Sequence, residues 1–285
     1  MAKLAQVWNP EQSREFKFYY LLKLNRMSED RPKKSLGQHW LYDIDALQAM
    51  VAAADVQAGD IVLEIGPGLG TLTKELCKVA TKVIAVEFDE LLASELPFRV
   101  PAENLEVRQG DILTFDFSSL PKNYKVVANI PYYLTSNLIR RMCEAGNPFS
   151  MAALLVQKEV AVRVCARPGQ TSLLSISTQY YCKVGLGPVV GAELFTPPPK
   201  VDSQILLLEY RAEPLFKGVD TVAFFKLVKA GFSERRKKLR SSLSGGLHIP
   251  KQEADELLQK AGISGDLRAQ SLSLDEWHQL YSAWC

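Results

Sequence analysis

Four consecutive residues, Asn129 to Tyr132, could hold a planar amine for chemistry at its nitrogen. An exocyclic amine on a nucleobase is a poor nucleophile because its lone pair is conjugated into the ring. Acceptors for both of its hydrogens favour a pyramidal nitrogen, and the Asn129 side-chain oxygen and the Ile130 carbonyl could serve as these acceptors. Pro131 would fix the turn, and the Tyr132 ring offers a flat face to a base pulled out of its stack. The alternative is a plain turn after a strand.

A glycine-rich loop upstream could bind a second reactant. The apolar run 61–65 predicts a strand, Gly66, Gly68 and Gly70 follow it, and a helical pattern begins at Thr71. Glycines let the backbone turn sharply and let a ligand approach the main chain closely. A dinucleotide fingerprint would be G-x-G-x-x-G, whereas the spacing here is G-x-G-x-G. The loop therefore suits a ligand without a pyrophosphate, although an ordinary tight turn would have the same spacing.

Two acids follow at the ends of the next two predicted strands. Glu87 follows the run 82–86 and could accept both hydroxyls of a ribose, and Asp111 follows the run 105–109 and could accept from an adenine amino group. Either acid alone is more often a solvated strand end. The order of glycine loop, acid, acid and Asn-Ile-Pro-Tyr is typical of ligand sites at the carboxyl edge of an open α/β sheet. A ribose and an adenine without a phosphate cradle indicate S-adenosylmethionine as a methyl donor.

The chain resembles the rRNA adenine N6,N6-dimethyltransferases that modify small-subunit ribosomal RNA, over residues 33–284. The resemblance depends on the segments 36–41, 64–70, 86–89, 110–111, 129–132, 155–160 and 195–203. Two departures are present, since Trp40 stands where the family usually has Phe, and the segment 171–175 lacks a glycine often found there. The resemblance implies direct methyl transfer from the donor to N6 of two adjacent adenosines, giving N6,N6-dimethyladenosine during ribosome maturation.

The resemblance also implies which residues bind the donor. The methionine end would be contacted by residues of the segment 36–41, the sulfonium side by the glycine loop, the ribose by the first acid and the adenine by the second. The donor-binding candidates are His39, Leu41, Gly66, Gly68, Glu87, Asp111 and Asn129.

The same resemblance implies how the target base is held. Asn129, Ile130, Pro131 and Tyr132 would form the seat for the base, and Phe195 would face Tyr132 across it. Stacking on aromatic side chains is worth about 1 to 3 kcal/mol per base in nucleic-acid binding generally. The alternative for Phe195 is core packing, the commoner fate of a lone phenylalanine.

Basic residues are concentrated between residues 221 and 240, where seven Lys or Arg stand against one acid. The apolar residues of this stretch have helical spacing, so we expect a helix with an apolar stripe inward and a cationic face outward. RNA phosphates would be the partner of that face, and an ordinary solvated helix surface is the alternative. The RNA-binding candidates are Arg235, Arg236, Lys237, Lys238 and Arg240.

Composition agrees with a cytoplasmic enzyme, although an organelle would accept the same composition. The chain has 285 residues, of which 47% are hydrophobic and 23% charged, and this suffices for one large and one small domain. No run approaches the roughly 18 apolar residues of a membrane span, and we expect no signal peptide. Five cysteines without a C-x-x-C pair and three unclustered histidines predict reduced thiols and no metal site. We expect a monomer whose partner is small-subunit rRNA or an immature small ribosomal subunit.

The pattern predicts an α/β fold with three parts. Residues 1–30 would be an extension, with Met27 as a second candidate start of translation. Residues 31–213 would form a Rossmann-like, doubly wound methyltransferase sheet, with a helix over 45–54, a strand over 151–157 and an antiparallel edge hairpin of 181–190 with 204–211. Residues 214–285 would form a small all-helical RNA-binding domain.

Three other functions share parts of this pattern. A large-subunit rRNA adenine methyltransferase of the macrolide-resistance type would have the same sheet and Asn-Ile-Pro-Tyr loop, although residues 268–273 look more like the small-subunit family. A non-catalytic RNA-binding assembly or transcription factor could keep the fold, but it would not need all of Glu87, Asp111, Asn129 and Tyr132. A small-molecule methyltransferase would not need the basic stretch.

Overall fold

The computed structural model describes residues 32, 33 and 36–285. The chain divides into two units between Gln38 and His39. In the first unit the main-chain nitrogen of Lys33 donates a 2.8 Å hydrogen bond to the Gln38 side chain. The predicted extension of residues 1–30, including Met27, lies outside the described residues.

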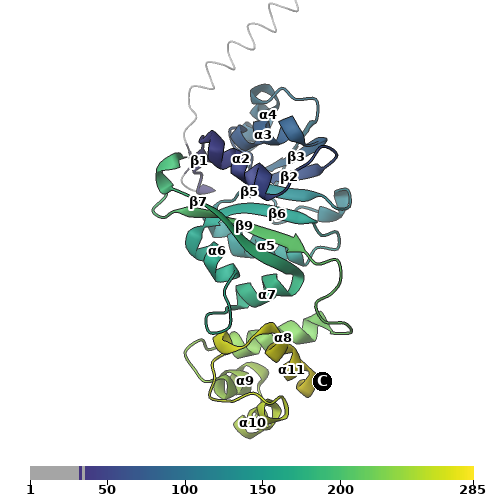
Figure 1. The fold of residues 1–285 in the computed structure, drawn as a ribbon, viewed down its shortest axis with the longest axis vertical. Coiled ribbons are helices and arrows are strands. Elements are labelled where there is room, and N and C mark those ends of the chain that lie inside the picture. The colour runs from purple at the N-terminus through teal and green to yellow at the C-terminus, as the bar shows by residue number, and fades with distance from the viewer. Residues whose placement is uncertain (1–31, 34–35) are drawn as a thin grey trace, which may run out of the picture. The chain divides into compact units, whose positions relative to one another are not determined.

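A seven-stranded sheet forms the centre of residues 39–285, with the strand order β4-β3-β2-β5-β6-β9-β7 (Figure 1). The first five strands are parallel, and β9 and β7 are antiparallel additions at one edge. The strands are β2 (Ile61–Ile65), β3 (Lys82–Glu87), β4 (Leu105–Gln109), β5 (Lys125–Asn129), β6 (Met151–Gln157), β7 (Cys182–Val190) and β9 (Ser203–Tyr210). The predicted doubly wound sheet with an antiparallel edge hairpin is confirmed.

Helices cover both faces of this sheet (Figure 1). One face carries α2 (Ile44–Ala53), α3 (Thr71–Val79) and α4 (Glu90–Arg99), and the other carries α5 (Thr135–Cys143), α6 (Lys158–Val164) and α7 (Leu173–Tyr181). Alternate side chains of a strand point to opposite faces, so Val83 of β3 packs in one apolar cluster and Ile84 in the other. The helix predicted over 45–54 is confirmed, one residue earlier in the chain.

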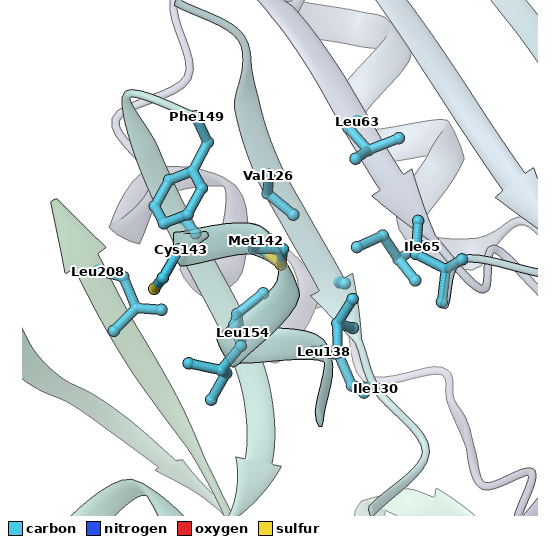
Figure 2. Close-up of a cluster of buried hydrophobic side chains, with 14 of the residues drawn as sticks. Leu63, Ile65, Val126, Ile130, Leu138, Met142, Cys143, Phe149, Leu154 and Leu208 are labelled. Carbon is cyan, nitrogen blue, oxygen red and sulfur yellow. The ribbon is translucent and has the colours of Figure 1, made fainter. Parts of the chain in front are cut away.

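The larger apolar cluster lies between the sheet and α5 (Figure 2). Figure 2 shows Leu138 and Met142 of α5 close to Val126 of β5 and Leu154 of β6, and all four side chains have no solvent exposure. Full burial of a side chain of this kind is worth about 1.5 to 3 kcal/mol. The cluster therefore holds β5 firmly, and β5 ends at Asn129.

A second, two-stranded sheet was not predicted. It pairs β1 (Trp40–Leu41) with β8 (Phe195–Thr196) in antiparallel register, Trp40 opposite Thr196 and Leu41 opposite Phe195. Two-residue strands are too short to show an alternating pattern, so only the tertiary structure reveals them. The pairing brings the segment around His39 to the proline-rich loop 197–202.

The C-terminal part is helical, as predicted. It contains α8 (Thr221–Phe232), α9 (Leu239–Leu247), α10 (Lys251–Lys260), the 3-10 turn η6 (Ala269–Ser271) and α11 (Leu274–Trp284) around a core that includes the fully buried Trp277. The boundary predicted at 213/214 falls between the last strand and α8, and it stays a prediction.

The prediction of a single basic helix between residues 221 and 240 is wrong. Helix α8 ends at Phe232, residues 233–238 form turns, and α9 begins at Leu239. Helices α8 and α9 approach closely at Gly246, where a Cβ would lie 2.5 Å from Ala230, and α8 approaches α11 at Gly231, where a Cβ would lie 2.3 Å from Trp277. The apolar spacing thus belongs to two helices that share one core.

One residue of η6 links the helical part to the sheet-bearing part. The Gln270 carbonyl accepts hydrogen bonds from Gly169 N (2.8 Å), Thr171 N (3.2 Å) and Thr171 Oγ1 (2.8 Å). The Gln270 side chain donates in return to the Gly169 carbonyl at 3.0 Å. These four bonds hold the loop before α7 against η6.

Candidate active site

The candidate site lies where the strand order reverses. From β2 the chain builds outward through β3 and β4, and it then returns to β5 on the other side of β2. Glu64 of β2 is paired with Val127 of β5, so Gly66 and Asn129 each stand two residues beyond the same paired position. Open α/β sheets bind ligands at such a switch point, outside the carboxyl ends of the strands.

The three glycines of the loop after β2 have different structural roles. Gly66, Gly68 and Gly70 have φ angles of 67°, 56° and 81°, which residues with side chains rarely adopt. A Cβ on Gly66 would meet nothing within 4 Å, whereas one on Gly70 would lie 2.7 Å from Val100. Gly70 therefore allows helix packing, and Gly66 leaves an open main chain that a ligand can approach.

Glu87 joins the glycine loop to β3. One carboxylate oxygen accepts from Gly68 N at 3.0 Å, and the other accepts from Asp89 N at 2.9 Å. The side chain is 5% exposed, and this burial raises the pKa of Glu87 while the two amides act in the opposite direction. The carboxylate is thus oriented at the loop, and its remaining lone pairs could accept ribose hydroxyls.

Asp111 lies beside Glu87 at the edge of the sheet, since Gly110 N donates to the Glu87 carbonyl at 2.8 Å. Asp111 Oδ1 accepts from Leu113 N at 2.8 Å, and within the described residues no group bonds to Oδ2.

Phe88, the residue after Glu87, is 57% exposed, and its carbonyl accepts from the Gln109 side chain at 3.3 Å. The sequence interpretation missed Phe88, whose signal was an aromatic residue directly after an acid at a strand end. Its ring could cover a face of an adenine.

The side-chain amide of Asn129 has a defined orientation. Its Nδ2 donates a 3.0 Å hydrogen bond to the His39 carbonyl. A carbonyl can only accept, so the amide must present Nδ2 to His39 and turn Oδ1 elsewhere. The Ile130 carbonyl accepts no hydrogen bond from any described group, while Ile130 N donates to Leu155 at 3.3 Å. Both acceptors needed for an amine are therefore available at the end of β5.

Tyr132 follows in the 3-10 turn η4 (Tyr132–Leu134), after Pro131 with φ −53°. Its hydroxyl is hydrogen-bonded to Ser203 Oγ at 2.8 Å, and Ser203 is fully buried. Burial disfavours the phenolate and raises the pKa of Tyr132. Ser203 belongs to the segment 195–203 that carried the resemblance, but no role was predicted for it.

His39 is the aromatic neighbour of Tyr132. The two rings are stacked, with centroids 5.8 Å apart and planes 23° apart. His39 Nδ1 is also 2.7 Å from the Pro197 carbonyl, which must accept from a protonated Nδ1. The structure therefore places His39 against the predicted base seat, and its expected contact with the donor stays a prediction.

Phe195 and Leu41 lie in the apolar core beneath this site. Their side chains are 3% and 2% exposed and belong to the cluster on the α2 side of the sheet. Phe195 thus packs as the core alternative predicts, and its stacking on a base stays a prediction that requires the ring to be uncovered. The contact of Leu41 with a ligand also stays a prediction.

One acid in the site was not singled out from the sequence. Glu64, next to the glycine loop in β2, is 1% exposed, and burial raises its pKa to about 8. One of its oxygens has no hydrogen-bond partner in the described part of the chain. Its position inside an apolar strand is the signal that could have drawn attention to it.

The basic residues after α8 differ in whether their charges form ion pairs with acidic side chains. Lys237 pairs with Glu234 at 2.8 Å, Lys238 with Asp266 at 3.1 Å, and Arg240 with Asp266 at 2.6 Å. For Arg235 and Arg236 no ion pair is found within residues 36–285. The five candidates lie in turns and at the start of α9, and two of them retain unpaired charge.

Other features do not compete for the role of active site. A hollow of about 330 Å³ between α3 and α4 is lined by Lys74, Glu75, Cys77, Lys78, Arg99, Val100, Pro101 and Ala102. None of the predicted site residues lines it. In the described part of the chain no group of three His, Cys, Asp or Glu could hold a metal, the five cysteines are free, and no helix is long and apolar enough to cross a membrane.

Comparisons with known proteins agree on one family. A family model described as ribosomal RNA adenine dimethylase matches residues 29–284. The ribosomal RNA small subunit methyltransferase A of Dehalococcoides mccartyi is 42% identical over 254 residues, 88% of this chain and 87% of the relative. That of Clostridioides difficile is 38% identical over 256 residues, 87% of this chain and 89% of the relative.

Two solved structures are similar over most of their length. A dimethyladenosine transferase from Plasmodium falciparum has a TM-score of 0.74 at 30% identity, covering 85% of this chain and 96% of that one. The 23S rRNA methyltransferase ErmE has a TM-score of 0.68 at 29% identity, covering 86% of this chain and 98% of that one.

Proposed function

Because this chain belongs to the ribosomal RNA adenine dimethylase family, we propose that it dimethylates N6 of two adjacent adenosines in small-subunit rRNA. It is an rRNA methyltransferase that depends on S-adenosylmethionine, and the product is N6,N6-dimethyladenosine formed during ribosome maturation. The observation that carries the proposal is the orientation of the Asn129 amide at the switch point, which turns Oδ1 away from the His39 carbonyl, together with the open main chain at Gly66.

The residues on the β2, β3 and β4 side fit the donor. The open main chain at Gly66 lets the sulfonium end approach, with Gly68 as the second predicted contact. The oriented Glu87 carboxylate accepts from the ribose hydroxyls, and Asp111 Oδ2 accepts from the adenine amino group. When bound, S-adenosylmethionine supplies an electrophilic methyl group on a positively charged sulfur. His39, Leu41 and Asn129 complete the set predicted to contact it.

The residues after β5 fit the acceptor. Asn129 Oδ1 and the Ile130 carbonyl accept the two N6 hydrogens, and the free face of Tyr132 supports the everted ring. The N6–C bond forms as the S–C bond breaks, S-adenosylhomocysteine leaves, and the extra proton on nitrogen passes to water. Acceptors aimed at the nitrogen's hydrogens stabilise its growing positive charge, so no general base is required. In the second transfer one hydrogen remains, and one of the two acceptors suffices.

The partner is small-subunit rRNA or an immature small ribosomal subunit. Arg235 and Arg236, the candidates without ion pairs among the described residues, bind its phosphates, and Lys237, Lys238 and Arg240 add to the same surface. Phe195 becomes a second stacking face only when its ring is uncovered. The enzyme acts in the cytoplasm as a monomer without a metal.

A second candidate is methylation of large-subunit rRNA, which the similarity to the 23S rRNA methyltransferase ErmE favours. The higher identity to small-subunit methyltransferases ranks it behind the first. One assay separates the two. The protein is incubated with labelled S-adenosylmethionine and either immature small subunits or large-subunit rRNA, and the modified base is mapped by mass spectrometry. We expect dimethyladenosine in small-subunit rRNA, and label confined to large-subunit rRNA would overturn the proposal.

A further inference from the structure

We propose that His39 is a positioning residue for the acceptor half of the site, where it aligns Asn129 and Tyr132 at the same time. The inference rests on the proposed function, because it takes these two residues as those that hold the base. It goes beyond the contact with the donor's methionine end that the family resemblance implies for His39.

The first contact is made by the main chain. The His39 carbonyl accepts the 3.0 Å hydrogen bond from Asn129 Nδ2. His39 directly precedes β1, whose pairing with β8 fixes the direction of this carbonyl. The orientation of the Asn129 amide therefore depends on where the short two-stranded sheet places His39.

The second contact is made by the ring. A centroid separation of 5.8 Å at 23° lies within the roughly 4.5 to 7 Å range of aromatic rings in direct contact. His39 therefore covers one face of Tyr132, and we assign the opposite face to the base. With the 2.8 Å bond from its hydroxyl to the buried Ser203, the Tyr132 ring is held at its face and at its tip.

The third contact anchors the His39 ring itself. Nδ1–H donates to the Pro197 carbonyl at 2.7 Å, and Pro197 directly follows β8. The loop from Pro197 leads to Ser203, the partner of Tyr132. The contacts thus link Asn129 to His39 and His39 to Pro197, and the loop after Pro197 leads to Ser203, which is bonded to Tyr132.

This linked set of contacts matters because methyl transfer depends on the alignment of the base amine with the donor methyl group. Misplacement of a reacting group by about 1 Å can cost roughly 100-fold in rate. A residue that restrains Asn129 through its main-chain carbonyl and Tyr132 through its ring would affect the productive pose of the base more than it affects donor affinity.

Two substitutions separate the parts of the side chain. His39→Phe keeps a ring on Tyr132 and loses the donor to Pro197, whereas His39→Asn keeps a donor and loses the ring. His39→Ala loses both. We expect His39→Ala to lower kcat/KM for small-subunit particles by about 10- to 100-fold, and the two partial variants to lose less. Because His39 is also predicted to contact the donor, donor Kd, measured by calorimetry, is expected to change in all three variants by a smaller factor than kcat/KM.

A double-mutant cycle with Tyr132 gives the decisive measurement. If His39 acts through Tyr132, the variant His39→Ala/Tyr132→Ala should lose no more activity than Tyr132→Ala alone. If the activity losses of the two single variants instead multiply in the double variant, the inference is overturned. A loss of donor affinity as large as the loss of kcat/KM would also overturn it. His248→Asn, at an exposed left-handed position remote from the site, is the matched histidine control and should keep full activity.

The same series distinguishes failure of this inference from failure of the proposed function. An inactive wild type on small-subunit particles would refute the function, while an active wild type with multiplying losses would refute only the role of His39. Donor binding by each variant shows that it is folded. Should His39→Ala not fold, the cycle is completed with His39→Asn, which also removes the ring from Tyr132, and the same criterion of multiplying losses applies.

Discussion

The His39 carbonyl and the Asn129 side chain, 90 residues apart in the chain, are joined by a 3.0 Å hydrogen bond. The acceptor is a main-chain atom, so no substitution at position 39 removes it. The bond therefore decides which end of the Asn129 amide faces His39, and with it which atom is left for the amine of the substrate.

Asn129 variants should separate turnover from donor binding. Asn129→Ala removes the acceptor Oδ1, and we expect kcat to fall by about 100-fold or more, in line with the loss of one transition-state hydrogen bond. Donor Kd should change by a much smaller factor than kcat, even though Asn129 is also predicted to contact the donor. Rapid-mix kinetics and calorimetry measure the two quantities. Equal losses in both would contradict the acceptor role.

Asn129→Asp is the sharper companion variant. The carboxylate has the same shape, but it places an oxygen where Nδ2 now donates to the His39 carbonyl. Two acceptors then face each other, so the side chain should rotate away and activity should be as low as in Asn129→Ala. Activity close to that of the wild type would show that the amide orientation is unimportant.

Two glycine variants should fail for different reasons. Gly70→Ala places a methyl group 2.7 Å from Val100 and 2.8 Å from Leu96 at φ 81°, so thermal unfolding should show a loss of about 1 to 3 kcal/mol. Gly66→Ala meets open space, so it should lose less stability and weaken donor binding instead. A Gly66→Ala protein with unchanged donor affinity would mean that the donor does not approach this loop.

The two arginines without ion pairs in the described structure should dominate the salt dependence of RNA binding. Each phosphate contact contributes about 0.7 to 0.9 to the slope of log K against log salt. Arg235→Ala/Arg236→Ala should therefore flatten the slope by about 1.5. Lys237 already pairs with Glu234 at 2.8 Å, so Lys237→Ala is the matched control and should change the slope less. An unchanged slope in the double variant would remove these residues from the interface.

Glu64 should make stability depend on pH. Its folded pKa is about 8 against 4.5 for an exposed glutamate, because the buried side chain favours the neutral acid. Between these values the folded state holds a proton that the unfolded state has lost, so stability falls as pH rises from 4.5 to 8 and is level above 8. Glu64→Gln cannot titrate and should be more stable than the wild type at pH 8, on the order of 1 to 3 kcal/mol.

Urea unfolding at pH 5 and pH 8 tests this prediction. The gain in stability from Glu64→Gln should be small at pH 5. At this pH the wild-type side chain is mostly protonated in the folded state, and the pH is only about half a unit above the unfolded pKa of 4.5. Parallel stability curves for the two proteins would show that Glu64 is not the group responsible.

Local signals predicted the sheet well. The strands at 61–65 and 151–157 have the predicted ends, because short β-branched or apolar runs bounded by glycine or polar residues show their limits in the sequence. The helix over 221–240 failed for the opposite reason. Apolar spacing continues through Leu239 while the backbone turns at 233–238, and the close approach of Gly231 to Trp277 involves residues distant in the sequence.

The sequence by itself determined the set of chemical groups and their common location. Parallel strands end at one edge of a sheet, so the order of glycine loop, two acids and Asn-Ile-Pro-Tyr already implied one site at that edge. Only the tertiary structure decided how the groups point. Long-range pairing of β1 with β8 sets His39 against Asn129 and Tyr132 and leaves Phe195 in the core, because two-residue strands have no periodicity and are stabilised only by the fold around them.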